Sequence, residues 1–253
     1  MSETASTSKA AGHRRWVRIC HWIAATSFLT LALSGFFILL VHPRLYLGHA
    51  GNDLTPALLT LPIGNDLRPD KMQSPVIFTE LPGAPVTAER NFPIFNQNGW
   101  ARSLHFLAAW FLVGAGAIYV AFGLVSGHIK RDLLPRAREL APRALLQDVK
   151  NHLRPVVGAI GAGPPYGLMQ KLAYTTVVLI ALPLMVATGL TMSPTVAAAY
   201  PFLLDLFGGY QTARTIHFFG FATLIVFLLV HIAMVVVTGF GRQLRAMTWG
   251  NQR

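Results

Sequence analysis

Apolar residues in this chain gather in four long runs, near residues 17–41, 103–126, 172–193 and 213–240. A run of about 20 largely apolar residues is the length that an α-helix needs to cross the hydrocarbon core of a bilayer. The four runs are too long and too continuous for the strands of a membrane barrel. The pattern predicts an all-α integral membrane protein built as a four-helix bundle.

The segments between these runs are polar and differ in character. Residues 42–102 carry eight prolines and several glycines, which block long helices and favour turns. We expect an irregular outer segment that covers the bundle or docks a partner. Residues 127–171 form the second connection, with a surface helix predicted from Pro142 to Leu153. We interpret residues 1–16 as a disordered N-terminus and 17–253 as one transmembrane domain, whose third run should kink at Pro183 and Gly189.

The distribution of basic residues along the chain predicts its orientation across the membrane. The composition is 53% hydrophobic and 12% charged, with a net charge of +11. Fifteen of the 21 basic residues precede the first run, lie between the second and third, or follow the fourth. The positive-inside rule therefore places both termini in the cytoplasm and residues 42–102 outside. We interpret the basic excess as a topology signal that contacts lipid headgroups, and not as a nucleic-acid surface.

The fourth run contains two histidines, His217 and His231, which are fourteen residues apart. In a helix, fourteen residues turn through about 1400°, which is about 40° short of four turns, and rise roughly 21 Å. The two imidazoles therefore share one stripe. Because polar residues at membrane depth cost free energy, they point to function. The spacing suits two metal cofactors at different depths.

The predicted topology gives each of these histidines a partner. The first helix runs outward, so His21 lies near its cytoplasmic end, whereas the second runs inward, so His105 lies near its outer end. His105 thus pairs with His217 as the outer pair, and His21 with His231 as the inner pair. Two facing histidines can clamp a planar iron porphyrin from both sides, and the closed coordination favours electron transfer.

Two other interpretations of these histidines stay open. A buried histidine can simply bond to a neighbouring carbonyl in the core. A zinc site is the second alternative, but no membrane-embedded Cys, Asp or Glu is available to complete the zinc ligands at either histidine pair.

An arginine stands one turn from three of these histidines. Arg102 precedes His105 in this way, and Arg18 and Arg214 stand likewise before His21 and His217. Haem has two carboxylate tails, which arginine binds well. We predict that Arg102 and Arg214 contact propionates of the outer haem, and that Arg18 contacts one of the inner haem. The alternative is arginine that reaches from a helix end to water.

Other candidate residues receive structural interpretations. Cys20 is the only cysteine and lacks a Cys-x-x-Cys-His context, so we expect a packing residue and a non-covalent haem. Five glycines inside the runs suit either a flat ring or close helix packing: Gly35, Gly114, Gly116, Gly189 and Gly220. Five further histidines are expected in solvated or interfacial positions: His13, His42, His49, His128 and His152.

Several motifs resemble a known family. The sequence Arg-Ile-Cys-His-Trp-Ile at 18–23 is similar to the Arg-x-x-His-Trp opening of bacterial four-helix di-haem b-type cytochromes. These include the membrane subunits of formate dehydrogenases and nickel-iron hydrogenases. Ser34-Gly35, residues 170–174 and residues 188–190 resemble the same family. Residues 41–49, 126–135, 204–209 and 213–217 resemble the branch known as thiosulfate reductase cytochrome b subunits.

This resemblance implies a bundle that holds two b-type haems in the bacterial cytoplasmic (inner) membrane. Such proteins pass electrons between the quinone pool and a partner oxidoreductase outside the membrane, often a molybdopterin enzyme. The long outer segment departs from the formate dehydrogenase type. Family analogy places a quinone site on the cytoplasmic side, where Lys171 and Tyr174 are the candidates. Interfacial anchoring is the alternative for both.

We therefore interpret the chain as the electron-transfer subunit of a membrane oxidoreductase complex. Two alternatives remain open. A stand-alone superoxide:quinone oxidoreductase would use Arg102 and Arg214 to attract the anion to an exposed outer haem edge. A haem-free membrane anchor would use the histidines only for packing.

Overall fold

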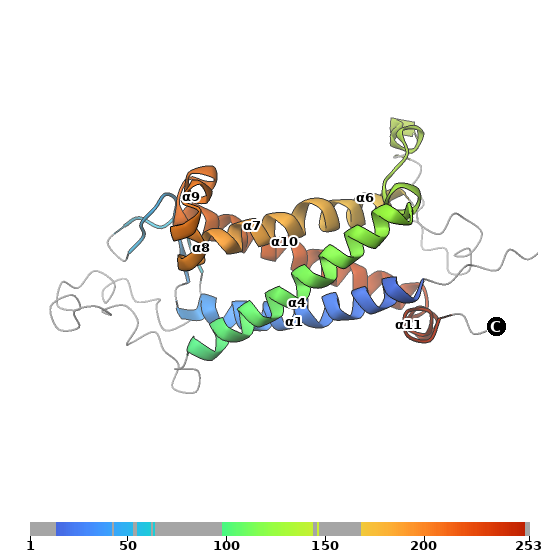
Figure 1. The fold of residues 1–253 in the computed structure, drawn as a ribbon, viewed down its shortest axis with the longest axis horizontal. Coiled ribbons are helices and arrows are strands. Elements are labelled where there is room, and N and C mark those ends of the chain that lie inside the picture. Colours follow the sequence, from blue (N-terminus) through green and yellow to red (C-terminus); the bar gives the residue numbers. More distant parts are fainter. Residues whose placement is uncertain are drawn as a thin grey trace, which may run out of the picture. The chain divides into compact units, whose positions relative to one another are not determined.

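The computed structural model describes residues 14–41, 43–52, 55–61, 63, 98–143, 146 and 168–250. Four helical segments in this part of the chain are long and apolar enough to cross a membrane: Arg15–Leu40, Gly99–Val125, Leu168–Thr191 and Tyr210–Val237. The prediction of an all-α, multi-pass membrane bundle is confirmed (Figure 1). The predicted surface helix beyond Arg143 lies almost entirely outside the described residues.

The long helices are α1 (Arg15–Val41), α4 (Asn98–Val125) and α10 (Tyr210–Val237). The third span consists of α6 (Leu168–Thr176), a π-helical turn η3 (Val177–Ala181) and α7 (Leu182–Thr191). Short elements join them: β1 (Arg44–Leu45), β2 (Leu59–Thr60), η1 (Ile129–Leu133), η2 (Ala137–Leu140), α8 (Pro194–Ala199), α9 (Phe202–Phe207) and α11 (Phe240–Thr248). The strands pair antiparallel, with Arg44 opposite Thr60.

The chain divides into two compact units, and each of the four spans contributes to both. Unit 1 contains residues up to Ile23, Ala115–Ile180 and Ile225–Arg253, and unit 2 contains Ala24–Gly114 and Ala181–Leu224. The outer histidine pair therefore belongs to unit 2, and the inner pair belongs to unit 1.

Small side chains face inward on the spans and large apolar ones face outward. On α4, Ala101, Ala108 and Ala115 are buried at a seven-residue spacing. Trp110 and Phe111 on the same helix are exposed, at 72% and 57%. In lipid there is no gain from hiding apolar side chains, so helices approach each other through small residues. The exposed apolar surface is the lipid-facing side that the four runs predicted.

The third span contains a π-helical turn directly before Pro183. Proline has no N–H, and its ring collides with the carbonyl four residues earlier in a regular α-helix. Here the α-helix stops at Thr176 and resumes at Leu182, which places Pro183 in the first turn of α7. The regular α-helix of the third span is thus interrupted by a single π-helical turn just ahead of Pro183, and the predicted kink stays a prediction.

In unit 2, the described start of the outer segment caps the first turn of α10. The Gly48 carbonyl accepts hydrogen bonds from the backbone N–H groups of Gln211 (2.9 Å) and Thr212 (3.3 Å). The Gly48 N–H donates to Thr212 Oγ1, at 2.7 Å. These bonds occupy N–H groups that have no partner within the helix. The structure thus supports the predicted covering role of the outer segment at this helix end.

Gly209 allows the same contact for two reasons. Its φ of +107° lies in the left-handed region, and a Cβ at this position would collide with the backbone of Gly48 and His49. Glycine is the only residue that satisfies both conditions without strain.

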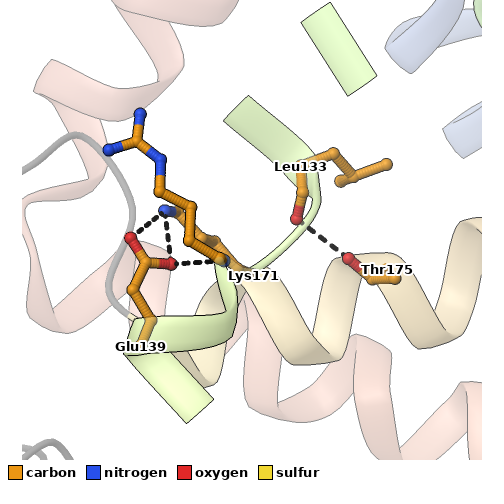
Figure 2. Close-up of polar contacts among 5 residues, drawn as sticks. Leu133, Glu139, Lys171 and Thr175 are labelled. Carbon is orange, nitrogen blue, oxygen red and sulfur yellow. Dashed lines mark hydrogen bonds and ion pairs between the residues drawn. The ribbon is translucent and has the colours of Figure 1, made fainter. Parts of the chain in front are cut away.

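In unit 1, the connection after α4 is tied to α6. Lys171 Nζ donates to both carboxylate oxygens of Glu139, at 2.9 and 3.0 Å, and Thr175 Oγ1 donates to the Leu133 carbonyl at 2.9 Å (Figure 2). Lys171 is 8% exposed. The hydrogen bonds from Lys171 and from the Arg136 backbone N–H lower the pKa of Glu139, so this carboxylate stays ionised at neutral pH.

The last helix, α11, is tied to the start of α1 (Figure 1). Arg18 Nη1 donates to the Thr248 carbonyl and Trp22 Nε1 to the Met247 carbonyl, both at 3.0 Å. These carbonyls lie in the last turn of α11 and have no partner within the helix. A cation is also favourable at this negative helix end. The fourth predicted run ended at 240, but α10 ends at Val237, because Gly239 turns the chain with a φ of +104°.

Candidate functional site

The two predicted outer histidines face each other within unit 2. His105 lies on α4 and His217 on α10, and both side chains are half-buried. Their ring centroids are 6.4 Å apart, with an angle of 56° between the ring planes. Two helices far apart in sequence thus bring two imidazoles to one point.

The two inner histidines face each other within unit 1 in the same way. His21 lies on α1 and His231 on α10, with ring centroids 6.4 Å apart and an angle of 50° between the planes. Within the described residues, no cluster of three or more His, Cys, Asp or Glu side chains could hold a metal ion. The metal-ligating candidates in this part of the chain are therefore pairs of histidines.

The spacing of both pairs fits a metal held between two imidazoles. A bond from a metal to an imidazole nitrogen is about 2 Å long, and that nitrogen lies about 1 Å from the centre of its ring. Two such bonds on opposite sides of one metal place the ring centres about 6 Å apart. Two imidazoles in direct contact would not need this separation, so both pairs fit an iron that is ligated from two faces.

Two buried hydroxyl groups bond to the outer histidines. Ser34 Oγ lies 3.0 Å from His105 Nδ1, and Thr188 Oγ1 lies 2.8 Å from His217 Nδ1. Both hydroxyl residues are fully buried. Since an Nδ1 that is held by a neighbour leaves Nε2 as the nitrogen for a metal, these bonds suit a ligand role for both histidines.

A glycine follows each of these hydroxyl residues and lies against the same imidazole. A Cβ on Gly35 would meet His105 Cε1 at 3.3 Å, and one on Gly189 would meet His217 Cε1 at 3.5 Å. The dipeptides Ser34-Gly35 and Thr188-Gly189 therefore form equivalent cradles on α1 and α7. Among the other predicted glycines, Gly220 allows close packing, because its Cβ would meet Met185 Sδ at 2.6 Å.

Aromatic rings surround the inner pair. Phe227 stacks on His231 with centroids 5.9 Å apart and planes 17° apart, and Tyr174 meets the same ring edge-on at 6.3 Å. Phe227 and His231 are four residues apart on α10, which places them on one face. On α1, Trp22 packs edge-on against His21 at 5.4 Å.

The three predicted propionate arginines lie in different surroundings. Arg102 is exposed. Arg214 is half-buried, and its Nη1 donates to Gln211 Oε1 at 3.2 Å. Arg18 uses Nη1 to bind the Thr248 carbonyl of α11, while its buried Nε has no hydrogen-bond partner among the described residues. The propionate role of all three stays a prediction, and Arg18 also has a structural role.

The two residues predicted to bind quinone have different surroundings in the structure. Tyr174 packs against the inner histidine His231, whereas Lys171 is buried in the ion pair with Glu139. Lys171 therefore holds the connection between the second and third spans.

His128 follows α4 directly and is largely enclosed, so of the two predicted surroundings, solvated or interfacial, the structure argues against the solvated one. Its side chain is 14% exposed, Nδ1 lies 2.7 Å from Asp132, and Trp16 and Tyr119 pack edge-on against its ring. His49 is exposed, as expected, and Cys20 is buried as the predicted packing residue. His13, His42 and His152 lie outside the described residues.

Comparison with known proteins identifies the family. Residues 12–250 match the family described as prokaryotic cytochrome b561. The chain belongs to this family. Membership implies a b-type haem and electron transfer, so this cytochrome is a multi-pass membrane haem protein.

One relative is similar to this cytochrome along nearly its whole length. It is the putative protein-methionine-sulfoxide reductase subunit YedZ1 of Azospira oryzae (strain ATCC BAA-33 / DSM 13638 / PS). The two chains are 26% identical over 239 residues, which cover 94% of this cytochrome and 96% of the relative. No solved structure matches this cytochrome.

Reasoning from the sequence alone missed several contacts around the histidines of this cytochrome. Ser34 and Thr188 were given no role beside the histidines, although a hydroxyl residue followed by glycine recurs in two different spans. That recurrence was the available signal. Phe227 had a signal too, since it stands four residues before His231. The contact between Trp22 and α11 joins residues 225 positions apart, and no local pattern indicates it.

Proposed function

We propose that this protein is a di-haem b-type cytochrome subunit that transfers electrons between membrane quinone and a partner oxidoreductase outside the cytoplasmic membrane. The observation that carries the proposal is that two separate histidine pairs have the same ring separation, 6.4 Å, which suits one iron between each pair. His105 and His217 are the ligands of the outer haem, and His21 and His231 are those of the inner haem.

A bound b-type haem supplies reversible one-electron chemistry. Histidines on both faces leave no open coordination position, which favours electron transfer over oxygen binding. The four residues hold and orient the cofactors without covalent attachment. Arg102 and Arg214 neutralise propionates of the outer haem, and Arg18 uses the part of its guanidinium not bound to α11 for a propionate of the inner haem.

Quinone binds beside the inner pair, on the cytoplasmic side. Tyr174 supports this placement, because its ring packs against His231 and it stands near the end of a span. An aromatic ring with a hydroxyl suits the flat, polar-tipped head of a quinone. Lys171 supports the site from behind, by holding the connection through Glu139.

The partner is an oxidoreductase of the molybdopterin type on the outer side of the bacterial inner membrane. The resemblance to cytochrome subunits of such complexes supports this, as does the name of the Azospira relative, a putative reductase subunit. If the partner reduces an oxidised substrate such as methionine sulfoxide, electrons flow from quinol outward. Both termini are cytoplasmic by the distribution of basic residues.

Haem content and quinol-dependent reduction test the proposal. The purified protein should contain two haems with b-type spectra, and His105→Ala and His21→Ala should each lose about one of them. Quinol should reduce the protein, and His21→Ala should slow this more than His105→Ala. Full haem content in both variants would refute the ligand assignment. Fast superoxide-dependent quinone reduction without a partner would instead show a self-sufficient enzyme.

A further inference from the structure

We propose that Ser34 and Thr188 are positioning residues that fix one tautomer of His105 and His217 and lower the reduction potential of the outer haem. This inference rests on the proposed function, in which these two histidines are its axial ligands. The observations are the two bonds between hydroxyl and Nδ1 and the direction in which their protons must point.

The proton positions follow from counting donors. A hydroxyl has one proton to donate and two lone pairs to accept. Ser34 Oγ lies 2.7 Å from the Thr30 carbonyl of its own helix, and Thr188 Oγ1 lies 2.8 Å from the Leu184 carbonyl. A carbonyl can only accept, so each hydroxyl proton is used there. In the contact with the hydroxyl, Nδ1 must therefore be the donor. The Leu31 carbonyl beside His105 and the Met185 carbonyl beside His217 are further acceptors for the same N–H groups.

A neutral imidazole carries one N–H and one bare nitrogen. When Nδ1 carries the proton, Nε2 is left with the lone pair that iron needs. The two hydroxyls therefore select the tautomer that can ligate through Nε2, and they fix the rotation of each ring. This role is positional, since neither hydroxyl is a ligand.

The same bonds also change the electron density of the ligand. An acceptor on Nδ1–H draws the proton away from the ring, which makes Nε2 more basic. A more basic ligand stabilises ferric iron over ferrous iron and so lowers the reduction potential. Each hydroxyl donates to a carbonyl at the same time, and such a chain strengthens both of its hydrogen bonds. Because Ser34 and Thr188 are fully buried, no water competes.

The experiment removes each hydroxyl from the full-length protein and measures both haem potentials by optical redox titration with electron paramagnetic resonance. The variants are Ser34→Ala, Thr188→Val and their combination. The outer potential should rise in each single variant and rise further in the double variant, while the inner potential stays constant. His105→Ala and His21→Ala identify which signal belongs to which haem.

Thr191→Val is a matched control on the same helix. Thr191 is equally buried, and its hydroxyl donates to the Ala187 carbonyl at 2.9 Å and has no hydrogen bond to a histidine among the described residues. This variant should leave both potentials unchanged. Thr188→Ser, which keeps the hydroxyl, should have the same outer potential as the unmodified protein.

Each contrary result has a clear meaning. An unchanged outer potential with full haem content in the double variant would overturn the proposal, and so would an equal rise in Thr191→Val. If the alanine and valine variants lose haem, the variants Ser34→Thr and Thr188→Ser take their place, because both keep a hydroxyl. A shift of the outer potential in these two variants would also overturn the proposal. If His105→Ala retains both haems, the ligand assignment fails, whatever the hydroxyl variants show.

Discussion

At the outer pair, His105 and His217 each bond through Nδ1 to a helix hydroxyl, whereas the contacts described at the inner pair are with aromatic rings. The ring separation is 6.4 Å in both pairs. Two pairs of equal ring separation thus have different described neighbours. A hydrogen bond fixes both the rotation and the tautomer of a ligand, while ring packing fixes the plane and leaves the tautomer to other groups.

The largest difference between the pairs should come from filling the glycine cradles of the outer one. Gly35→Ala places a methyl group 3.3 Å from His105 Cε1, which is tighter than ordinary contact, whereas Gly189→Ala places one at a comfortable 3.5 Å from His217. Overpacking of this kind costs about 1–3 kcal/mol. We expect Gly35→Ala to lose most of the outer haem during purification, measured as the ratio of haem to protein.

Gly189→Ala is the matched control and should retain nearly all of its haem. Loss of the inner haem in Gly35→Ala, or equal losses in both variants, would contradict the cradle geometry.

A smaller effect should follow from removing the stacked ring of the inner pair. Phe227→Leu keeps an apolar side chain but loses an aromatic contact with His231, which is worth about 0.5–1.5 kcal/mol. The inner haem should dissociate about threefold to tenfold more readily in a haem-transfer assay, and the outer haem should not change. Phe219→Leu, an exposed aromatic position on the same helix, serves as control. Equally faster dissociation of the outer haem in Phe227→Leu would show that the effect of this ring is not specific to the inner pair.

A still smaller effect should come from Trp22→Phe. This change keeps a ring beside His21 but removes the N–H that donates to the Met247 carbonyl of α11. The lost bond is worth about 1 kcal/mol. We expect faster proteolysis after Arg242 or Arg245 and a shift in the low-spin resonance of the inner haem. A change in the protease pattern without a change at the haem would show that α11 does not influence the inner pair.

The smallest effect concerns the Lys171–Glu139 pair and depends on pH. The pKa of Glu139 is lowered in the folded state, so the pair stabilises the connection above the unfolded pKa of about 4.3 and loses this contribution as pH falls through the folded value. The protection of η1 and η2 against hydrogen exchange, expressed relative to the intrinsic rate at each pH, should be constant from pH 8 to about pH 5 and fall below about pH 4. Glu139→Gln should exchange faster at neutral pH and lose this acid transition. An acid transition of unchanged size in this variant would assign it to another group.

The fold was largely predictable because lipid imposes a strong rule on sequence. A span must be a helix of about 20 apolar residues, and hydropathy alone shows where such helices are. Their ends were harder to place. Gly239 ends α10 at Val237 although the apolar pattern continues to Phe240, since a positive φ depends on the local backbone and not on hydropathy.

The pairing of the histidines was also predictable, because it follows from topology and helix rise. The contacts that orient their rings were not. A hydroxyl on α1 meets His105 because of the rotation of two helices about their axes, which the charge distribution does not determine. The neighbours of His128 could not be predicted for a related reason. Its position between two spans did not indicate that Trp16 and Tyr119 enclose its ring or that Asp132 provides a partner.

The cap on α10 has a consequence for the biogenesis of the protein. Gly48 and Thr212, which form it, are 164 residues apart, so the segment after the first span can make this contact only when the last span has been synthesised. Until then the backbone of Tyr46, which is buried in the finished protein, lacks its partner on α10. Thr215 then closes the contact by donating to the Tyr46 carbonyl at 2.7 Å. A chain interrupted before its fourth span therefore lacks both of these contacts.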